Sequence, residues 1–418
     1  MNESALLPAY VPGEFLSVGV RVDWQLVGTG GLLVDAGTIA RAADDRARLR
    51  WPAQRLPASS GWRPGDAPGM LRYASLQHAG PLDGLRAELR GALAAMSRLA
   101  QRRGLALAGG GLHPLQGWTR TAALQPPRPH HPFRVGTLSI RIGCVEADAA
   151  VRLAQAMSRF APHVAALAAS SPMAQGVDTG LDSARLQTLH LRPGACALPW
   201  CADWAGYRAA WFRAARAGTL VLRDGEPPWD VRPLSSPGCI ELRVADTPLA
   251  LEQVVRLAAL ARCLARWLEL EHPFEPDAGD NALHAHNRMA AARHGFSARL
   301  VKRDGRMPWL HEDLTALLER LAPHARALDC GAELEALALR TRMGVNDAHA
   351  IRQWHADGHD AARVVGLAAR LLADEVRGDP GPPAPAAPGR WRVPAVARAE
   401  RVVSLTRAAY AACDARPR

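Results

Sequence analysis

Strands are predicted where apolar and polar residues alternate with a period of two. Residues 15–35 (FLSVGVRVDWQLVGTGGLLVD) predict a strand, a glycine turn and a second strand. Residues 134–147 alternate in the same way and predict one further strand, and residues 105–111 predict a short one. Residues 229–246 predict two strands that are joined by a Pro/Gly turn and therefore lie side by side.

Helices are predicted where apolar residues recur every three or four positions. This pattern covers residues 81–104, 147–172, 207–217 and 249–270, and residues 281–376 are predicted to be entirely helical. The helices and strands follow one another without strict alternation. We therefore expect an α+β fold that is built on a mainly antiparallel sheet and has a mostly helical C-terminal part.

Polar and proline-rich segments interrupt these elements. Residues 40–70 and 125–133 are predicted to be loops. We expect residues 1–376 to form the main domain, residues 377–390 to form a Pro-rich linker, and residues 391–418 to form a C-terminal helix. Such a tethered helix can dock on its own domain, on a second copy of the chain or on another protein.

The composition is that of a soluble protein with a substantial core, since 48% of the 418 residues are hydrophobic and 22% are charged. No apolar run reaches the roughly 18 residues of a membrane span, and the N-terminus lacks a basic start followed by an apolar stretch. The seven cysteines are widely spaced, as expected of reduced, buried thiols. Two histidine pairs, His284/His286 and His355/His359, lack the further ligands of a metal site. We expect a cytoplasmic protein that does not bind membranes.

The net charge of +11 is typical of proteins that bind nucleic acids or other anions. Lys302 is the only lysine among the 51 basic residues, and the arginines are spread along the chain rather than gathered in runs. We therefore expect no nucleic-acid binding and interpret the charge as favouring some other anionic ligand or partner.

The most informative group of charged residues lies on the two adjacent strands of residues 229–246. Asp230 and Arg232 are two residues apart, as are Glu241 and Arg243, so each pair shares one face of the sheet. Two acid–arginine pairs on one face can hold a metal–phosphate group or a carboxylate substrate. The same pattern also fits a solvated sheet face that carries cross-strand ion pairs.

Seven segments, in order, resemble the motifs of the carboxylate–amine ligase family, the second type of glutamate–cysteine ligase. The resemblance extends from about residue 15 to residue 375. The segments are SVGVRVDWQLV, GLHPLQGW, GTLSIRIG, SSPMAQGVDTGLDSARLQ, WDVRP, IELRVAD and NRMAAARHGFSARLV.

The resemblance implies a sheet that is curved into a funnel and flanked by helices, related to that of glutamine synthetase. It also implies a reaction in which ATP activates an amino-acid carboxylate to an acyl phosphate, which an amine then attacks. Mg²⁺ ions would bridge the phosphate oxygens and would be held by carboxylates of the first strand, a histidine of a His-x-His strand and the glutamate of Glu-x-Arg. ATP and Mg²⁺ are therefore the expected cofactors if the chain is active.

Most of the family's metal ligands are replaced in this chain. Its three consecutive glutamates align with residues 21–23, of which only Asp23 is acidic, and its two histidines align with Ser139 and Arg141. Gln77 stands near a further expected glutamate. The retained family residues are Asp178, Arg185, Asp230, Arg232, Glu241, Arg243, Asp246, Asn287 and Arg293.

These alignments give each candidate residue an expected role. Glu241, Arg243 and Asp23 are the candidate catalytic residues, and Glu241 and Asp23 are also the remaining candidate metal ligands. The residues expected to bind the substrate or another anion are Arg21, Arg141, Arg185, Asp230, Arg232, Asp246 and Arg293. Arg21 and Arg141 would bring positive charge into a site for divalent cations, and we expect this charge to weaken or abolish the ATP–Mg²⁺ arrangement.

Three functions remain open from the sequence. The first is a family member that has lost ligase activity and acts as a non-catalytic subunit or binds a carboxylate or another anion. The second is an active ATP-dependent ligase that joins an amino-acid or peptide carboxylate to an amine. The third is a different enzyme on the same scaffold that uses no nucleotide. In each case we expect a homo-oligomer or a complex with another protein.

Overall fold

The computed structural model of the chain describes residues 9–35, 39, 60–65, 69–115, 135–190, 195, 197–218 and 227–378. Within these residues a seven-stranded antiparallel sheet has the order β2-β3-β1-β5-β9-β8, and β4 also pairs with β1. The strands are β1 (Val18–Val27), β2 (Gly61–Pro64), β3 (Met70–Ala74), β4 (Ala106–Ala108), β5 (Thr137–Gly143), β8 (Val231–Ser235) and β9 (Gly238–Asp246), and a separate two-stranded sheet contains β6 (Met173–Ala174) and β7 (Val177–Asp178).

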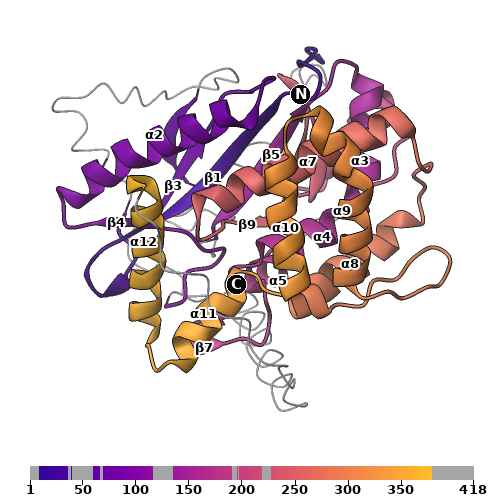
Figure 1. Ribbon diagram of the computed structural model, residues 1–418. Coiled ribbons are helices and arrows are strands. Elements are labelled where there is room, and N and C mark those ends of the chain that lie inside the picture. The colour runs from indigo at the N-terminus through magenta and orange to yellow at the C-terminus, as the bar shows by residue number, and fades with distance from the viewer. Residues whose placement is uncertain are drawn as a thin grey trace, which may run out of the picture.

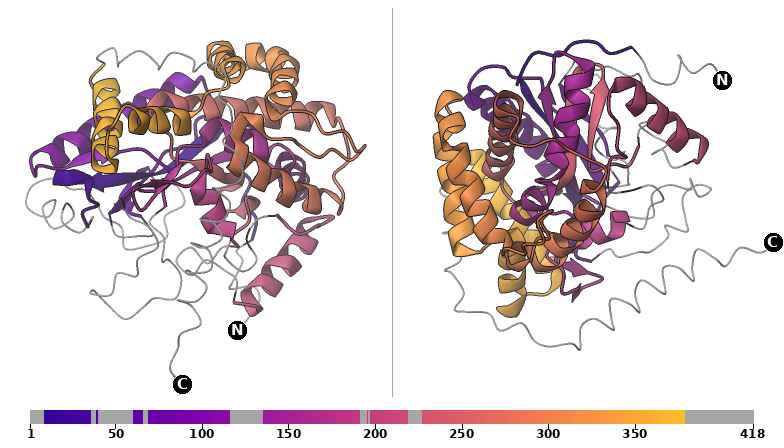
Figure 2. Two further views of the ribbon diagram at one scale, coloured as in Figure 1. Left: turned by 90° about the horizontal axis from the view of Figure 1, so that it is seen from below. Right: turned by 90° about the vertical axis from the view of Figure 1, so that its right-hand side faces the viewer.

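Most of the helices lie on one side of the sheet, whereas the helix of residues 204–216 projects on the other side, and helices form most of the C-terminal half (Figures 1 and 2). They are α2 (Leu82–Gln101), α3 (Ala147–Ser158), α4 (Ala161–Ala168), α5 (Ala184–His190), α6 (Trp204–Arg216), α7 (Leu251–Glu271), α8 (Asp280–His294), α9 (Leu310–Ala327), α10 (Gly331–Met343), α11 (Asp347–Ala356) and α12 (Ala361–Arg377). The expected α+β class, the antiparallel sheet and the helical C-terminal part are confirmed. None of the helices in the described segments is long and apolar enough to cross a bilayer.

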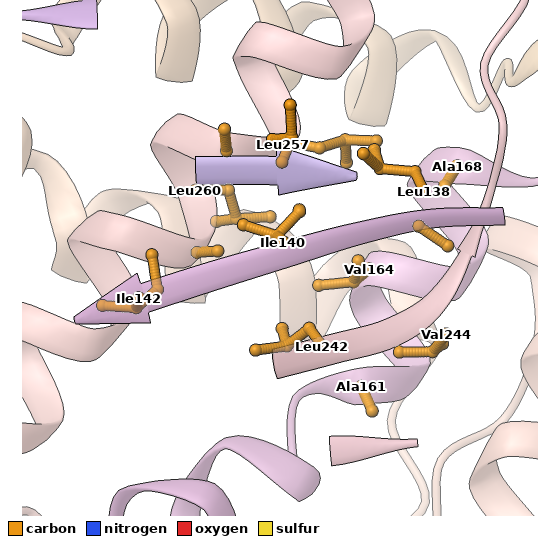
Figure 3. Packing of buried hydrophobic residues seen from close by; sticks show 14 of the residues in the cluster. Leu138, Ile140, Ile142, Ala161, Val164, Ala168, Leu242, Val244, Leu257 and Leu260 are labelled. Atoms are coloured by element: carbon orange, nitrogen blue, oxygen red, sulfur yellow. The ribbon is translucent and has the colours of Figure 1, made fainter. Parts of the chain in front are cut away.

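The core lies between one face of the sheet and the helices that cover it. Every second residue of the central strands points to this face, for example Ile140 of β5 and Leu242 of β9. Figure 3 shows these side chains beside Val164 of α4 and beside Leu257 and Leu260 of α7. Because full burial of one such side chain stabilises a fold by roughly 1.5–3 kcal/mol, this face fixes the position of the strands.

The opposite face of the same strands is polar, yet its side chains are mostly buried. It carries the alternate residues of each strand, and their positions follow from the same period of two. These residues include Arg21, Asp23 and Gln25 of β1, Arg72 of β3, Ser139 and Arg141 of β5, Arg232 of β8, and Glu241 and Arg243 of β9. Charged groups in buried positions need partners, so this face of the sheet is the candidate location of a functional site.

Helix α12 is tied to the start of helix α7 through Glu375. Its two carboxylate oxygens accept hydrogen bonds from the backbone nitrogens of Leu251, at 2.5 Å, and Glu252, at 2.8 Å, in the first turn of α7. A carboxylate at this place satisfies amide groups that have no partner within their own helix. The C-terminal helix of the described chain therefore supports the longest core helix.

Two local predictions were wrong. The segment 40–70, predicted as a loop, contains β2 at Gly61–Pro64, and β3 begins at its last residue. An edge strand of four residues that begins with glycine and ends with proline shows too little alternation to be recognised. The second strand expected after the glycine turn is only a single bridge between Leu33 and Val27.

Some predictions fall on residues that the structure does not describe. The loop predicted at 125–133 and the predicted C-terminal helix at 391–418 lie outside the described residues. Of the predicted linker 377–390, only the first two residues are described, and they close α12. The proposed domain boundaries therefore stay predictions. The five cysteines within the described segments are buried, as expected for thiols in a core.

Candidate functional site

Glu241 of β9 has no exposed surface and is surrounded by four arginines. Arg232 donates to Oε2 from Nε at 3.1 Å and from Nη2 at 2.8 Å. Arg141 donates from Nε to Oε1 at 3.2 Å, and Nη2 of Arg21 lies 3.3 Å from the same oxygen. Nε of Arg243 lies 3.9 Å from Oε2. Each carboxylate oxygen therefore has two guanidinium neighbours, and we call these five residues the Glu241 cluster.

Strand register places these side chains together. Arg141 of β5 is opposite Glu241, which is in turn opposite Arg232 of β8, so the three form one row across the sheet. Arg21 of β1, opposite Ser139, belongs to the next row on the same face. Directly opposite residues have Cβ atoms about 5 Å apart, which allows long side chains to converge on one carboxylate.

The cluster is strongly electropositive. Four guanidinium groups and one carboxylate give it a net charge of +3. Burial alone would raise the pKa of Glu241, but Arg21, Arg232, Arg141 and Arg243 outweigh it and hold the pKa well below its usual value. Burial would lower the pKa of Arg141, and the charge of Glu241 outweighs that effect and raises it. The carboxylate of Glu241 and the guanidinium group of Arg141 therefore stabilise one another in their charged forms.

The second candidate metal ligand, Asp23, is held by Arg72. Nε of Arg72 donates to Oδ1 at 2.5 Å and Nη2 donates to Oδ2 at 2.9 Å, and both side chains are almost fully buried. Arg72 lies directly opposite Asp23 on β3, and Arg63 lies opposite Arg72 on β2. This two-point contact is the geometry in which arginine binds carboxylate most strongly.

The residues present do not fit the magnesium ion that the resemblance implies. Mg²⁺ requires several oxygen ligands in near-octahedral geometry, and both candidate carboxylates are bonded by arginines instead. Among the described residues no group of three or more His, Cys, Asp and Glu side chains is arranged to hold a metal ion. The positive charges of Arg21 and Arg141 would also repel a divalent cation.

Three of the four arginines reach the surface of the site. The side chains of Arg141, Arg243 and Arg21 are 21%, 17% and 10% exposed, whereas that of Arg232 is 1% exposed. They come from β5, β9 and β1, which are three neighbouring strands. Arg232 is therefore the most deeply buried of the four arginines, and the side chains of the other three keep a small exposed fraction.

Arg185 and Asp246, both expected to bind substrate, bind one another. Nε of Arg185 donates to Oδ1 of Asp246 at 2.6 Å, and both residues are buried. Asp246 also accepts hydrogen bonds from the hydroxyls of Ser171, at 2.6 Å, and Ser183, at 2.7 Å. It lies five residues along β9 from Glu241, a distance of about 16 Å at the usual rise of a strand. The structure thus places this pair in a buried network that fastens residues 170–185 to the sheet.

Asp230 contacts two residues of α8. Nε of Arg288 lies 2.6 Å from Oδ2 of Asp230, and Nε2 of His284 lies 2.9 Å from the same oxygen. Burial raises the pKa of Asp230, but the charges and hydrogen bonds of Arg288 and His284 outweigh it and lower the pKa. Arg293, also expected to bind an anion, is exposed in the last turn of α8 and is not part of these contacts.

Two other retained residues have structural partners. Asn287 exchanges two hydrogen bonds with the backbone of Val301, at 2.9 and 2.7 Å, and so holds the segment that follows α8. Asp178 lies 3.3 Å from Nε of Arg352. Gln77 lies against Gly19, on which an added Cβ would be 3.0 Å from the Gln77 amide nitrogen.

Sequence reasoning missed Arg72, Arg288 and the role of His284. Arg72 was overlooked because β3 was not recognised as a strand, since Met70–Ala74 has the sequence MLRYA and shows no alternation of apolar and polar residues. His284 was examined only as half of a metal-binding pair. Because Arg288 follows His284 by four residues, both lie on the same face of the predicted helix, and this spacing could have indicated that they contact the same acidic residue.

Comparison with known proteins gives a consistent result. A model described as glutamate-cysteine ligase family 2 (GCS2) matches residues 79–366 of this chain. A Cronobacter sakazakii protein named "Putative glutamate--cysteine ligase 2" is 30% identical over 381 residues, which cover 88% of this chain and 99% of that protein. An Azoarcus sp. protein with the same name is 33% identical over 363 residues, covering 83% of this chain and 92% of that protein.

Solved structures with a similar fold have much lower sequence identity. A glutamate–cysteine ligase from Francisella tularensis, in complex with AMP, has a TM-score of 0.64 and 11% identity, and the match covers 98% of this chain and 97% of that chain. A bifunctional glutathione synthetase from Pasteurella multocida has a TM-score of 0.54 and 10% identity over 88% of this chain and 52% of that chain. At such identities the similarity concerns the fold, and it confirms the ligase-like architecture that the resemblance implied.

Proposed function

This chain belongs to glutamate–cysteine ligase family 2, and from that premise we propose that it has lost the ATP- and Mg²⁺-dependent ligase reaction and binds a carboxylate or another small anion at the Glu241 cluster. It would act as a non-catalytic member of the family, by itself or as a subunit of a homo-oligomer or of a complex with another protein. Arg21, Arg141 and Arg243 would contact the anion, and Arg232 would hold Glu241.

The observation that carries this proposal is the saturation of Glu241 by four arginines. A ligase of this kind needs carboxylate oxygens that are available to bind Mg²⁺, because the metal bridges and neutralises the phosphate oxygens. In this chain the carboxylates of Glu241 and Asp23 already neutralise buried arginines. Releasing either one to a metal would break its buried ion pairs with arginine, which is costly in a desolvated position.

The alternative is an active ATP-dependent ligase that joins an amino-acid or peptide carboxylate to an amine. In that case Glu241, Arg243 and Asp23 would be catalytic, and the arginine contacts would have to open when Mg²⁺–ATP binds. The relatives named as ligases are the reason to test this alternative directly.

The test is an assay of ADP release from ATP, with Mg²⁺, against panels of amino-acid carboxylates and amines that include glutamate and cysteine. We expect no release above that of a Glu241→Gln variant, because no metal-bound phosphate can be assembled. The matched control is Glu335→Gln, which changes an exposed glutamate of α10 in the same way. Substrate-dependent release that Glu241→Gln abolishes and Glu335→Gln preserves would establish the active ligase instead.

A further inference from the structure

Two cysteines contact each other where helix α10 packs against helix α7. Cys263 lies in the second half of α7, and Cys330 directly precedes the first turn of α10. Both side chains belong to the main hydrophobic core, and both thiols are free. The thiol of Cys263 donates a hydrogen bond to the sulfur of Cys330. Two thiols in direct contact are the starting geometry for a disulfide bond.

The surroundings of Cys330 favour its thiolate form. The hydrogen bond from Cys263 is the largest effect that lowers the pKa of Cys330, and the guanidinium group of Arg262 lowers it further. Burial and the carboxylates of Glu333 and Asp329 act in the opposite direction but do not outweigh these effects. Cys330 also stands at the N-terminus of α10, where the helix dipole stabilises negative charge. Because the thiolate is the reactive form, Cys330 is the nucleophile of the pair.

The turn before α10 brings Cys330 close to solvent. Its neighbour Asp329 is exposed and has a φ of 53°, a left-handed conformation that is costly for a residue other than glycine. On the other side, a Cβ added to Gly331 would meet nothing within 4 Å among the described residues beyond its own chain neighbours and helix backbone. Cys330 therefore lies between a strained, exposed residue and an open one, and a small reagent reaches it by local opening of the turn.

A soft metal ion is the other ligand class that two thiols bind. The charges of Arg262 and Arg266 act on Cys263, and the same charges would repel a metal cation. Among the residues that the structure describes, no group of three or more His, Cys, Asp and Glu side chains is arranged around a metal position. Disulfide formation brings no cation to the site and therefore fits the pair better.

We infer that Cys263 and Cys330 are a redox-sensitive pair that a small peroxide oxidises to a disulfide bond between α7 and α10. In the first step the Cys330 thiolate attacks hydrogen peroxide, takes up one oxygen atom as a sulfenic acid and releases hydroxide. In the second step the sulfur of Cys263 attacks the sulfenic sulfur, and the hydroxyl group leaves as water with the thiol proton of Cys263. The two cysteines are thereby oxidised and the peroxide is reduced, and a thiol reductant reverses the change.

The test treats the native full-length protein with hydrogen peroxide, blocks the remaining thiols under denaturing conditions and maps the linked peptides by mass spectrometry. We expect one dominant link, between Cys263 and Cys330, which dithiothreitol removes. The rate of oxidation should reach half its maximum at a pH below the pKa of an ordinary cysteine, about 8.5. The oxidised protein should unfold at a temperature about 2–5 °C higher, because the bond cross-links two core helices.

Serine variants separate the two roles. Cys263→Ser should leave a sulfenic acid on Cys330 that dimedone traps, and Cys330→Ser should abolish both products. The matched control is Cys201→Ser, because burial raises the pKa of Cys201 to about 11 and this thiol should not react. Serine can still donate to the carbonyl oxygen that each thiol contacts, which is that of Leu328 for Cys330 and that of Pro199 for Cys201.

The map of the wild-type protein decides the outcome even if a serine variant fails to fold. Absence of the link between Cys263 and Cys330 in the native protein would overturn the inference, and so would a link that forms only after unfolding in urea. Equal oxidation of Cys201 and Cys330 would also overturn it, because reactivity would then not depend on the contact with Cys263. The result is independent of the ADP assay, since neither cysteine belongs to the Glu241 cluster.

Discussion

At the residue scale the site depends on Glu241, since its carboxylate neutralises arginines that come from four different strands. Asp23 of β1 is bonded in a similar way by Arg72 of β3, which pairs with the edge of β1 that faces away from β5. The sequence identified Glu241 and Asp23 as the chemically important acids. It could not show that arginines already bind them, because alternation gives the face of a side chain but not the register between strands.

Replacing Glu241 should destabilise the protein. We expect Glu241→Gln to lower the free energy of unfolding by about 3–5 kcal/mol at neutral pH, because it removes one partner of a buried, hydrogen-bonded ion pair with Arg232. Urea denaturation measures the change. The control Glu335→Gln, at an exposed position, should stay within about 0.5 kcal/mol of the wild type.

The same variant should change the dependence of stability on pH. The pKa of Glu241 is lowered by folding, so its charge stabilises the fold fully above the pKa of an unfolded glutamate, about 4.3. That contribution is lost as the pH falls towards the folded-state pKa. The difference in stability between the wild type and Glu241→Gln should therefore shrink below about pH 4. A difference that stays constant down to about pH 3 would contradict this account.

At the element scale most of the fold could be read from the periodicity. The strands β1, β5, β8 and β9 and the helices α2 and α7 lie where alternation and helical repeats predicted them. The strands β2 and β3 were missed because each has only four or five residues. The failure to predict β3 affected the candidate site, because Arg72, the partner of Asp23, lies on that strand.

The contact of Glu375 with the start of α7 should be measurable as helix capping. We expect Glu375→Ala to lower the free energy of unfolding by about 1–2 kcal/mol, because two amides of the first turn lose their acceptor. Glu335→Ala, an exposed change within α10, is the matched control for helix propensity. Equal effects of the two substitutions in urea denaturation would show that the cap does not contribute.

At the scale of the whole molecule the sheet separates two environments. One face is apolar and covered by helices, and the other carries the arginine-rich site. Of the 51 basic residues that give the chain its net charge of +11, five are the arginines paired here with Glu241 and Asp23. The resemblance in the sequence was enough to identify the family and the replaced ligand positions. The contacts that now occupy the remaining carboxylates could not be predicted in this way, because they join strands that are far apart in the sequence.

The most direct test of the account is a titration with Mn²⁺, a paramagnetic substitute for Mg²⁺, followed by electron paramagnetic resonance. The wild type is compared with the double variant Arg21→Glu/Arg141→His, which restores two of the family's ligand types beside Glu241. The control, Arg98→Glu/Arg102→His, makes the same changes at exposed positions at the end of α2. We predict that only the Arg21→Glu/Arg141→His variant binds Mn²⁺. Tight binding by the wild type that Glu241→Gln abolishes would contradict the claim that arginines have replaced the metal site.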